Sequence, residues 1–189
     1  PGFPMNGTWY RYNGTEAEDG TSFAVTSNAD TYNLLPSSAY LFTNFPAEKC
    51  QLVYKAADAG PGTLRYALSC AQPGDTIRFL YSVLSDTIQL LTALDIDKNV
   101  VIEGNADYPM VLSAAQSDRA IHVLPGVSCE LSGLNLQGGS NTSGSCIFNE
   151  GILIANKIKC TKSGLINPVS LLYNASGATI EYRGQNQIE

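Results

Sequence analysis

The sequence is poor in charge: charged residues make up 15% of its 189 positions, and it contains a single histidine and a single tryptophan. Its 11 basic residues are scattered from Arg11 to Arg183 and are outnumbered by 17 acidic ones, so no basic patch can follow a phosphate backbone. No segment supplies the ~20 consecutive apolar residues that a membrane helix needs. We therefore expect neither a nucleic-acid partner nor direct insertion into a membrane.

The sequence also lacks cysteine and histidine residues at the spacing of a metal site. The five cysteines include no CxxC pair, and His122 alone cannot complete a Cys/His zinc set. We expect no metal and no cofactor. In an oxidising compartment we predict a disulfide between Cys50 and Cys70, because these two residues bracket one compact segment. The three later cysteines are expected to be buried and unpaired.

Small polar residues are abundant, since Gly, Asn, Ser and Thr together make up about a third of the chain. This composition favours strands joined by many turns. From Asp75 onward, short β-prone runs follow one another with turn residues between them. The predicted strands are residues 76–79, 87–90, 100–102, 110–112, 120–124, 134–136, 152–154 and 179–182. The runs are too close together for crossover helices, and residues 138–145 are predicted to form a mobile loop.

The first part of the chain differs from the rest. Residues 1–48 are expected to form a β-rich cap, or the end of a preceding domain, with period-two strands at residues 22–26 and 40–45. One helix is predicted at residues 64–71, because apolar residues recur there at helical spacing. Thr63 is suited to cap its first turn.

A weak repeat of about 25 residues points to a solenoid. Residues 147–154 and 172–180 share the order aromatic residue, Asn, Gly and strand. The sequence therefore predicts an all-β fold, a short right-handed parallel β-helix over residues 49–189, in which Asn149 and Asn174 stack on each other. An antiparallel β-sandwich, which also uses short strands and frequent turns, remains the alternative.

Two consecutive motifs resemble a known family. Residues 57–68 read Ala-Asp-Ala-Gly-Pro-Gly-Thr-Leu-Arg-Tyr-Ala-Leu, and residues 71–79 read Ala-Gln-Pro-Gly-Asp-Thr-Ile-Arg-Phe. This order of helix, turn and strand resembles the opening of the parallel β-helix regions of bacterial surface proteins. Residues 131–139 and 147–154 are similar to later parts of these regions. The resemblance covers residues 50–182 and implies a parallel β-helix, with fewer rungs than the family usually has.

The positions of Cys50 and Cys70 around the first motif resemble those in very large exported proteins of the Bacteroidetes group. The resemblance implies an extracellular place on the cell surface of a Gram-negative bacterium and export by the type IX route. It also implies export or outer-membrane anchoring proteins as partners. Thr76 and Thr87 lie in Asp-Thr-Ile triplets that look like the O-glycosylation sites of such exported proteins.

Carboxylates that could cleave a sugar chain are few. Asp95 and Asp97 are two residues apart, so on a strand they would point to the same face, but we interpret them as solvated turn charges. His122 alternates with two apolar neighbours and is expected to face solvent. We therefore predict a non-enzymatic module of a large exported adhesin, serving display, attachment or recognition by the export machinery. A glycan-binding or polysaccharide-cleaving β-helix protein is the alternative.

Two surfaces are candidates for contact with partners. Trp9, Tyr10 and Tyr12 could stack on a surface glycan, although burial in the cap is the simpler interpretation. The last rung of a solenoid exposes unpaired backbone groups, so residues 174–189 are predicted to form a docking edge. Apolar contact would come from the strand before it, from Leu171, Leu172 and Tyr173.

Overall fold

The computed structural model describes residues 7–12, 23–25, 39–43, 51–115, 117–162 and 170–189, with side chains described from residue 51 onward. The chain divides into two compact units, residues 1–49 and residues 50–189. The boundary lies one residue beyond the predicted end of the cap at residue 48.

The first unit contains a three-stranded antiparallel sheet in the order β2-β1-β3. Strand β1 spans Gly7–Tyr12, β2 spans Phe23–Val25 and β3 spans Ala39–Thr43. The last two coincide with the predicted period-two strands. The register places Trp9 of β1 beside Phe23 of β2 and Phe42 of β3.

The second unit contains the one α-helix of the described chain, α1, which spans Leu64–Cys70 and follows the short strand β4 (Leu52–Val53). The hydroxyl of Thr63 accepts the backbone N–H of Tyr66, as expected of an N-cap residue. Leu64, Ala67 and Leu68 face inward and are buried, which confirms the helical spacing seen in the sequence.

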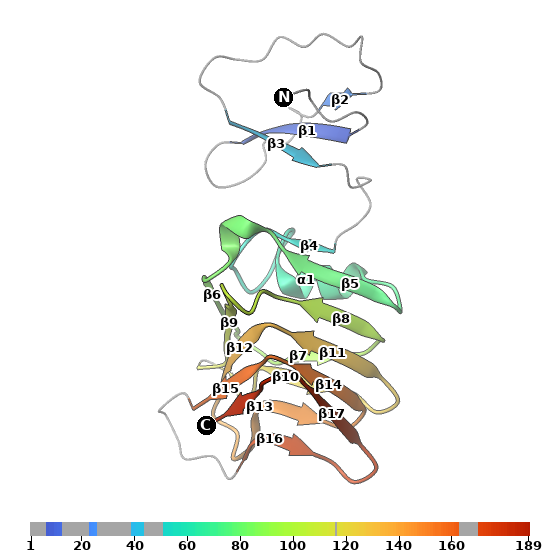
Figure 1. The fold of residues 1–189 in the computed structure, drawn as a ribbon, viewed down its shortest axis with the longest axis vertical. Coiled ribbons are helices and arrows are strands. Elements are labelled where there is room, and N and C mark those ends of the chain that lie inside the picture. Colours follow the sequence, from blue (N-terminus) through green and yellow to red (C-terminus); the bar gives the residue numbers. More distant parts are fainter. Residues whose placement is uncertain (1–6, 13–22, 26–38, 44–50, 116, 163–169) are drawn as a thin grey trace. The chain divides into compact units, whose positions relative to one another are not determined.

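The rest of the second unit is a parallel β-solenoid of about five turns, as predicted, and the sandwich alternative is excluded by the parallel pairing. Its strands form three sheets, in the orders β16-β13-β10-β7, β17-β14-β11-β8-β5-β4 and β18-β15-β12-β9-β6. Figure 1 shows members of each sheet stacked one above another along the unit. A short 3₁₀-helix, η1 (Tyr81–Val83), joins β5 to β6. The strands are β4 (Leu52–Val53), β5 (Asp75–Phe79), β6 (Thr87–Gln89), β7 (Leu94–Ile96), β8 (Val100–Glu103), β9 (Met110–Ser113), β10 (Ile121–Val123), β11 (Ser128–Ser132), β12 (Leu134–Gln137), β13 (Ser143–Asn149), β14 (Ile152–Asn156), β15 (Lys159–Thr161), β16 (Ser170–Asn174), β17 (Thr179–Arg183) and β18 (Gln187–Ile188).

The core is a set of apolar ladders inside the solenoid. Ile77, Ile102 and Leu131 are register partners on β5, β8 and β11, and each is fully buried. Leu112 and Leu136 form a similar step on β9 and β12. Each rung buries its inner face only by stacking on its neighbours, so the same interior supports all three outer faces.

The predicted repeat is confirmed by the register of β13 and β16, where Phe148 pairs with Tyr173 and Asn149 with Asn174. The side chain of Asn149 is buried and donates to Asn174 Oδ1 at 2.6 Å. It also donates to the carbonyl of Thr179 at 2.9 Å. Stacked asparagine side chains thus tie the last two turns together along the solenoid axis. Within the described ranges no helix is both long and apolar enough to span a membrane.

Candidate binding groove

One outer face carries a ladder of side chains that differ in chemistry from rung to rung. The ladder consists of Asp95 on β7, His122 on β10, Phe148 on β13 and Tyr173 on β16, and the parallel register places each beside the next. The residues on either side of His122, Ile121 and Val123, are fully buried. Because side chains alternate along a strand, His122 points outward, as predicted.

His122 lies between two carboxylates. Its Nδ1 is 3.2 Å from Asp95 Oδ1, and its Nε2 is 2.7 Å from Glu150 Oε2. An ionised carboxylate can only accept hydrogen bonds, so both contacts are hydrogen bonds only when both ring nitrogens carry protons. In that charge state the imidazolium joins three consecutive turns of the solenoid.

The aromatic part of the ladder is in contact with a guanidinium group. The rings of Phe148 and Tyr173 are stacked, with centroids 5.1 Å apart and an interplanar angle of 12°. The Cζ atom of Arg119 lies 4.5 Å from the centroid of Phe148, and His122 meets the same ring edge to face. A cation over an aromatic face is attracted by the ring quadrupole, so Phe148 holds Arg119 in place.

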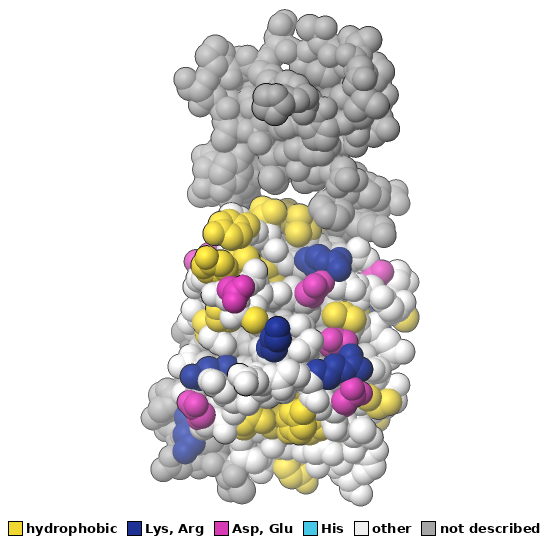
Figure 2. Space-filling model, viewed as in Figure 1, with side chains coloured by type: hydrophobic (Ala, Val, Ile, Leu, Met, Phe, Trp, Pro, Cys, Tyr) yellow, Lys and Arg dark blue, Asp and Glu magenta, His cyan; other side chains and the backbone are white. Residues whose placement is uncertain are grey.

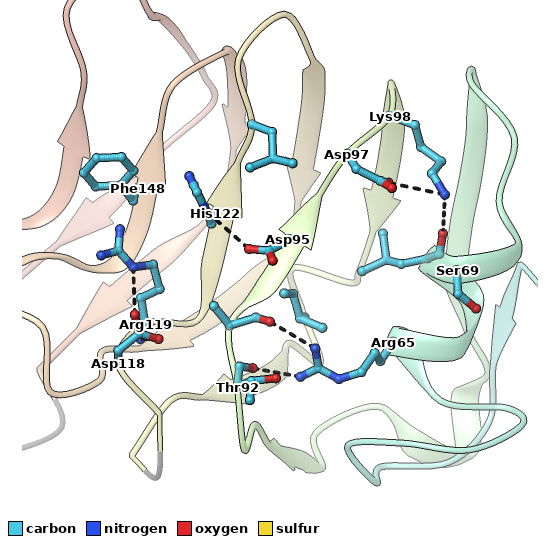
Figure 3. A pocket seen from close by; sticks show the side chains of 14 residues that line it. Arg65, Ser69, Thr92, Asp95, Asp97, Lys98, Asp118, Arg119, His122 and Phe148 are labelled. Atoms are coloured by element: carbon cyan, nitrogen blue, oxygen red, sulfur yellow. Dashed lines mark hydrogen bonds and ion pairs between the residues drawn. The ribbon is translucent and has the colours of Figure 1, made fainter.

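The ladder opens onto a groove with a volume of about 980 Å³, bounded by α1 on one side and by β7 and β10 on the other. Figure 3 shows Arg65 of α1 reaching the chain at Thr92, and Lys98 reaching the end of α1 near Ser69, with Asp95 and His122 on the strands beside them. The groove thus combines three basic and three acidic side chains with His122 and one aromatic ring. Its charged lining residues are Arg65, Lys98, Arg119, Asp95, Asp97 and Asp118.

The turn that carries Asp118 and Arg119 is fixed by the loop before β13. Asn141 donates its backbone N–H to the carbonyl of Asp118 at 2.9 Å. A Cβ atom at Gly139 would lie 2.5 Å from that same carbonyl oxygen, so only glycine permits this close approach. The loop predicted at residues 138–145 is therefore shorter than expected, because β13 already begins at Ser143. The part of the loop before β13 is hydrogen-bonded to this turn.

Asp95 and Asp97 both line the groove. This is the placement that the alternative, a polysaccharide-cleaving enzyme, requires. Asp95 is central in β7, rather than in a turn as expected, while Asp97 directly follows the strand. Each contacts a basic side chain: Asp95 contacts His122, and Asp97 Oδ1 lies 3.3 Å from Lys98 Nζ.

The other predicted contact residues lie away from this groove or outside the described part of the chain. Trp9, Tyr10 and Tyr12 are on β1, but their side chains are not among those described, so their glycan contact stays a prediction. Thr76 is half-buried on β5 and Thr87 is exposed on β6. Of the two threonines, only Thr87 is therefore exposed.

The predicted docking residues fall on β16, an edge strand of its sheet. Leu171 is buried and Leu172 is half-buried, whereas Tyr173 is 41% exposed. Of the three, Tyr173 therefore offers the most surface to a partner.

The later cysteines are structural. Cys129, Cys146 and Cys160 are free and buried, as predicted. Burial, together with the nearby charge of Glu130, raises the pKa of Cys129 to about 12. A hydrogen bond with Cys146 and burial raise the pKa of Cys160 as well. Because the thiolate is the nucleophile, neither Cys129 nor Cys160 is suited to catalysis.

The predicted disulfide involves Cys50, which lies outside the described residues, so the pairing stays a prediction. Its proposed partner, Cys70, is the last residue of α1. The three cysteines shown to be free leave Cys50 and Cys70 as the remaining pair of the sequence.

Sequence reasoning missed Arg119, Phe148 and Glu150. The signal was present, because the repeat that aligns Phe148 with Tyr173 extends backward to His122 and Asp95 at intervals of one turn. Aligning residues 94–96 and 121–123 with residues 147–149 and 172–174 would have placed the four middle side chains on one face. The contacts of Arg119 and Glu150 lie outside the triplets and depend on the turns between strands.

No group of three or more His, Cys, Asp or Glu side chains in the described residues is arranged to hold a metal ion. Comparison with protein-family models, with curated proteins and with solved structures yields no match for the chain.

Proposed function

We propose that the protein is a non-enzymatic module that attaches to carbohydrate through the groove beside α1. The observation that carries this proposal is the pairing within the groove, where Asp95, Asp97 and Asp118 each contact a basic side chain of the same site. Such an arrangement supplies fixed hydrogen-bond donors and acceptors of the kind that orient sugar hydroxyls.

The setting of the proposal comes from the sequence resemblance. We place the module on the cell surface of a Gram-negative bacterium, as part of a large adhesin exported by the type IX route. Two features of the fold suit that setting: it exposes long outer faces on a rigid interior, and its groove is lined by α1, by β7, β10 and β13 and by the turns between these strands.

A glycan panel tests the binding function. The 189-residue protein is labelled and exposed to immobilised plant and microbial polysaccharides and oligosaccharides. We expect retention on a subset of them, reduced when Phe148 is replaced by Ala and unchanged when the exposed Tyr182 of β17 is replaced by Ala. Absence of retention on every glycan would contradict the proposal.

Polysaccharide cleavage is the second candidate, favoured by Asp95 and Asp97 lining one groove. A hydrolase needs one carboxyl group of such a pair as a protonated acid, whereas both carboxylates here contact a basic side chain. Assays for new reducing ends and for unsaturated products decide between the two functions. Cleavage that is lost in Asp95→Ala and in Asp97→Ala would establish the enzyme.

The proposal includes anchoring through the final turn. Strands β16, β17 and β18 are each at the edge of a sheet, and the inward-facing Tyr182 and Ile188 are 55% and 42% exposed. Thr179 donates its N–H toward β14, so alternation turns the N–H of Tyr182 to the open side. A partner strand could pair there.

A proline at this edge tests anchoring. Tyr182→Pro removes an outward N–H without removing a bond to β14, and Tyr182→Ala is the matched control that removes only the side chain. We expect surface display of the full-length protein to fall with the proline and to persist with the alanine. Equal display of both variants would remove the support for strand addition.

A further inference from the structure

We propose that the groove takes an acidic glycan, and that the guanidinium group of Arg119 binds the carboxylate of a uronic acid unit. This inference rests on the proposed carbohydrate binding and adds the chemical class of the sugar. It follows from a difference among the three basic side chains of the groove.

Arg65 and Lys98 use their donors within the protein. Arg65 Nη2 donates to Asp58 Oδ1 at 2.7 Å, and both of its terminal nitrogens donate to backbone carbonyls just before β7. Lys98 Nζ donates to a carbonyl of α1 at 3.1 Å and lies 3.3 Å from Asp97. These two cations position α1 against the sheet, and little of their donor capacity is left for a ligand.

Arg119 is held in one orientation, but the two terminal nitrogens of its guanidinium group, which form a fork, remain free to bind a ligand. Its Nε lies 3.4 Å from Asp118 Oδ2, while Asp118 Oδ1 accepts the backbone N–H of Arg119 at 2.9 Å. The Phe148 ring holds the flat side of the guanidinium. Among the described residues, neither Nη1 nor Nη2 has a hydrogen-bond partner. Figure 3 shows the group lying between Asp118 and Phe148 at the edge of the groove.

An open guanidinium fork matches a carboxylate, because two parallel N–H groups can meet two oxygens. The side chain of Arg119 is only 14% exposed, so its charge is screened less by water than that of a surface arginine. An anion bound there gains a charge-assisted pair of hydrogen bonds without any rearrangement of the arginine.

The rest of the groove favours hydroxyl groups over further anions. Its three basic and three acidic side chains balance, so a polyanion of high charge density gains little from the site as a whole. Asp95, Asp97 and Asp118 are each more than half exposed and can accept hydrogen bonds from hydroxyls. A volume of about 980 Å³ accommodates more than one sugar ring. One carboxylate surrounded by hydroxyls is the chemistry of a uronic acid.

Calorimetric titration with matched sugars tests the inference. The probes are tetrasaccharides of glucuronic, galacturonic and mannuronic acid, each paired with its neutral counterpart made of glucose, galactose or mannose. Arg119→Gln removes the charge, Arg119→Lys keeps the charge without the fork, and Arg78→Gln on β5 is a matched control away from the groove. Thermal unfolding of each variant verifies that it folds.

We expect the wild-type protein to bind one acidic sugar about tenfold to a hundredfold more tightly than its neutral counterpart. Arg119→Gln should abolish that preference, Arg119→Lys should keep only part of it, and Arg78→Gln should leave it intact. Equal binding of acidic and neutral sugars by the wild type would overturn the inference while leaving the proposed function standing. Retained preference in Arg119→Gln would also overturn it, and no binding to any sugar would overturn both.

Discussion

The groove face and the face formed by β5, β8, β11, β14 and β17 rest on the same apolar interior, yet their charges are held differently. On the second face, Arg78 and Glu103 form an ion pair of 2.8 Å while 59% and 46% exposed. In the groove, the side chains of His122 and Arg119 are 25% and 14% exposed. Ion pairs alone therefore do not distinguish a site; the limited exposure of the basic side chains and their unused donors do.

The second face also shows how ordinary charged side chains behave on this fold. Arg183 pairs with Glu181 at 2.7 Å and with Glu130 at 3.3 Å. The hydrogen bond to Glu181 raises the pKa of Arg183, so this group keeps its charge at any physiological pH. On the face seen in Figure 2, basic and acidic side chains lie beside one another and neither sign gathers into a large patch. Such exposed pairs contribute little stability.

The largest effect is expected from a change that removes the interior shared by both faces. Leu112→Ala should lower the free energy of unfolding by about 3 kcal/mol, because Leu112 is fully buried and its loss leaves a cavity. Urea denaturation measures the change. The matched control is Val111→Ala, at a half-buried outward position of the same strand. A loss below about 1 kcal/mol for Leu112→Ala would show that the ladder tolerates gaps.

The next largest effect is expected at the corner between the two faces. Asn149→Ala should cost about 2 kcal/mol, since it leaves the buried N–H of Gly151 and the carbonyl of Thr179 without their side-chain partner. Asn174→Ala, at an exposed position in the same ladder, should cost less. Equal losses in urea denaturation for the two variants would mean that burial does not set the value of these bonds.

A smaller effect is expected from the histidine bridge of the groove face. His122→Gln should cost about 1 kcal/mol, because glutamine cannot bond both flanking carboxylates from the same position. A double-mutant cycle with Glu150→Gln measures the coupling. We expect a coupling energy of about 0.5 kcal/mol, since roughly a third of the Glu150 side chain is exposed. A coupling of zero would indicate that the 2.7 Å contact contributes nothing to stability.

The smallest effect is expected from the exposed ion pair on the second face. Arg78→Gln should change the free energy of unfolding by less than about 0.5 kcal/mol, and the difference should shrink further as salt is added. Denaturation at low and high ionic strength measures it. A loss larger than that of His122→Gln would reverse the contrast between the two faces.

Much of the fold could be predicted from the sequence because a solenoid repeats one local pattern. The β-prone runs at residues 100–102 and 110–112, and the capped helix after Thr63, depend on neighbouring residues alone. Strands such as β15 (Lys159–Thr161) and β18 (Gln187–Ile188) were missed because each contains a single apolar residue. The pairing of such a strand depends on the neighbouring turn of the solenoid, on which it stacks.

The groove was only partly predictable for a related reason. His122 was correctly placed facing outward, whereas Asp95, interpreted as a turn charge, lies within β7. Their neighbours are 25 to 30 residues away in sequence, as in the contacts of His122 with Asp95 and Glu150. Such contacts require the register between turns, which the weak repeat indicated for only one pair of strands.

The most direct test of the account is to map a bound sugar on the protein by NMR. Backbone amide shifts of the 189-residue protein are recorded while the uronic acid tetrasaccharide that binds most tightly is added. The account predicts that the saturating changes fall on Asp95, Arg119, His122 and Phe148, with none on Arg78 or Glu103. Changes confined to the β5–β17 face, or to residues 1–49, would contradict it.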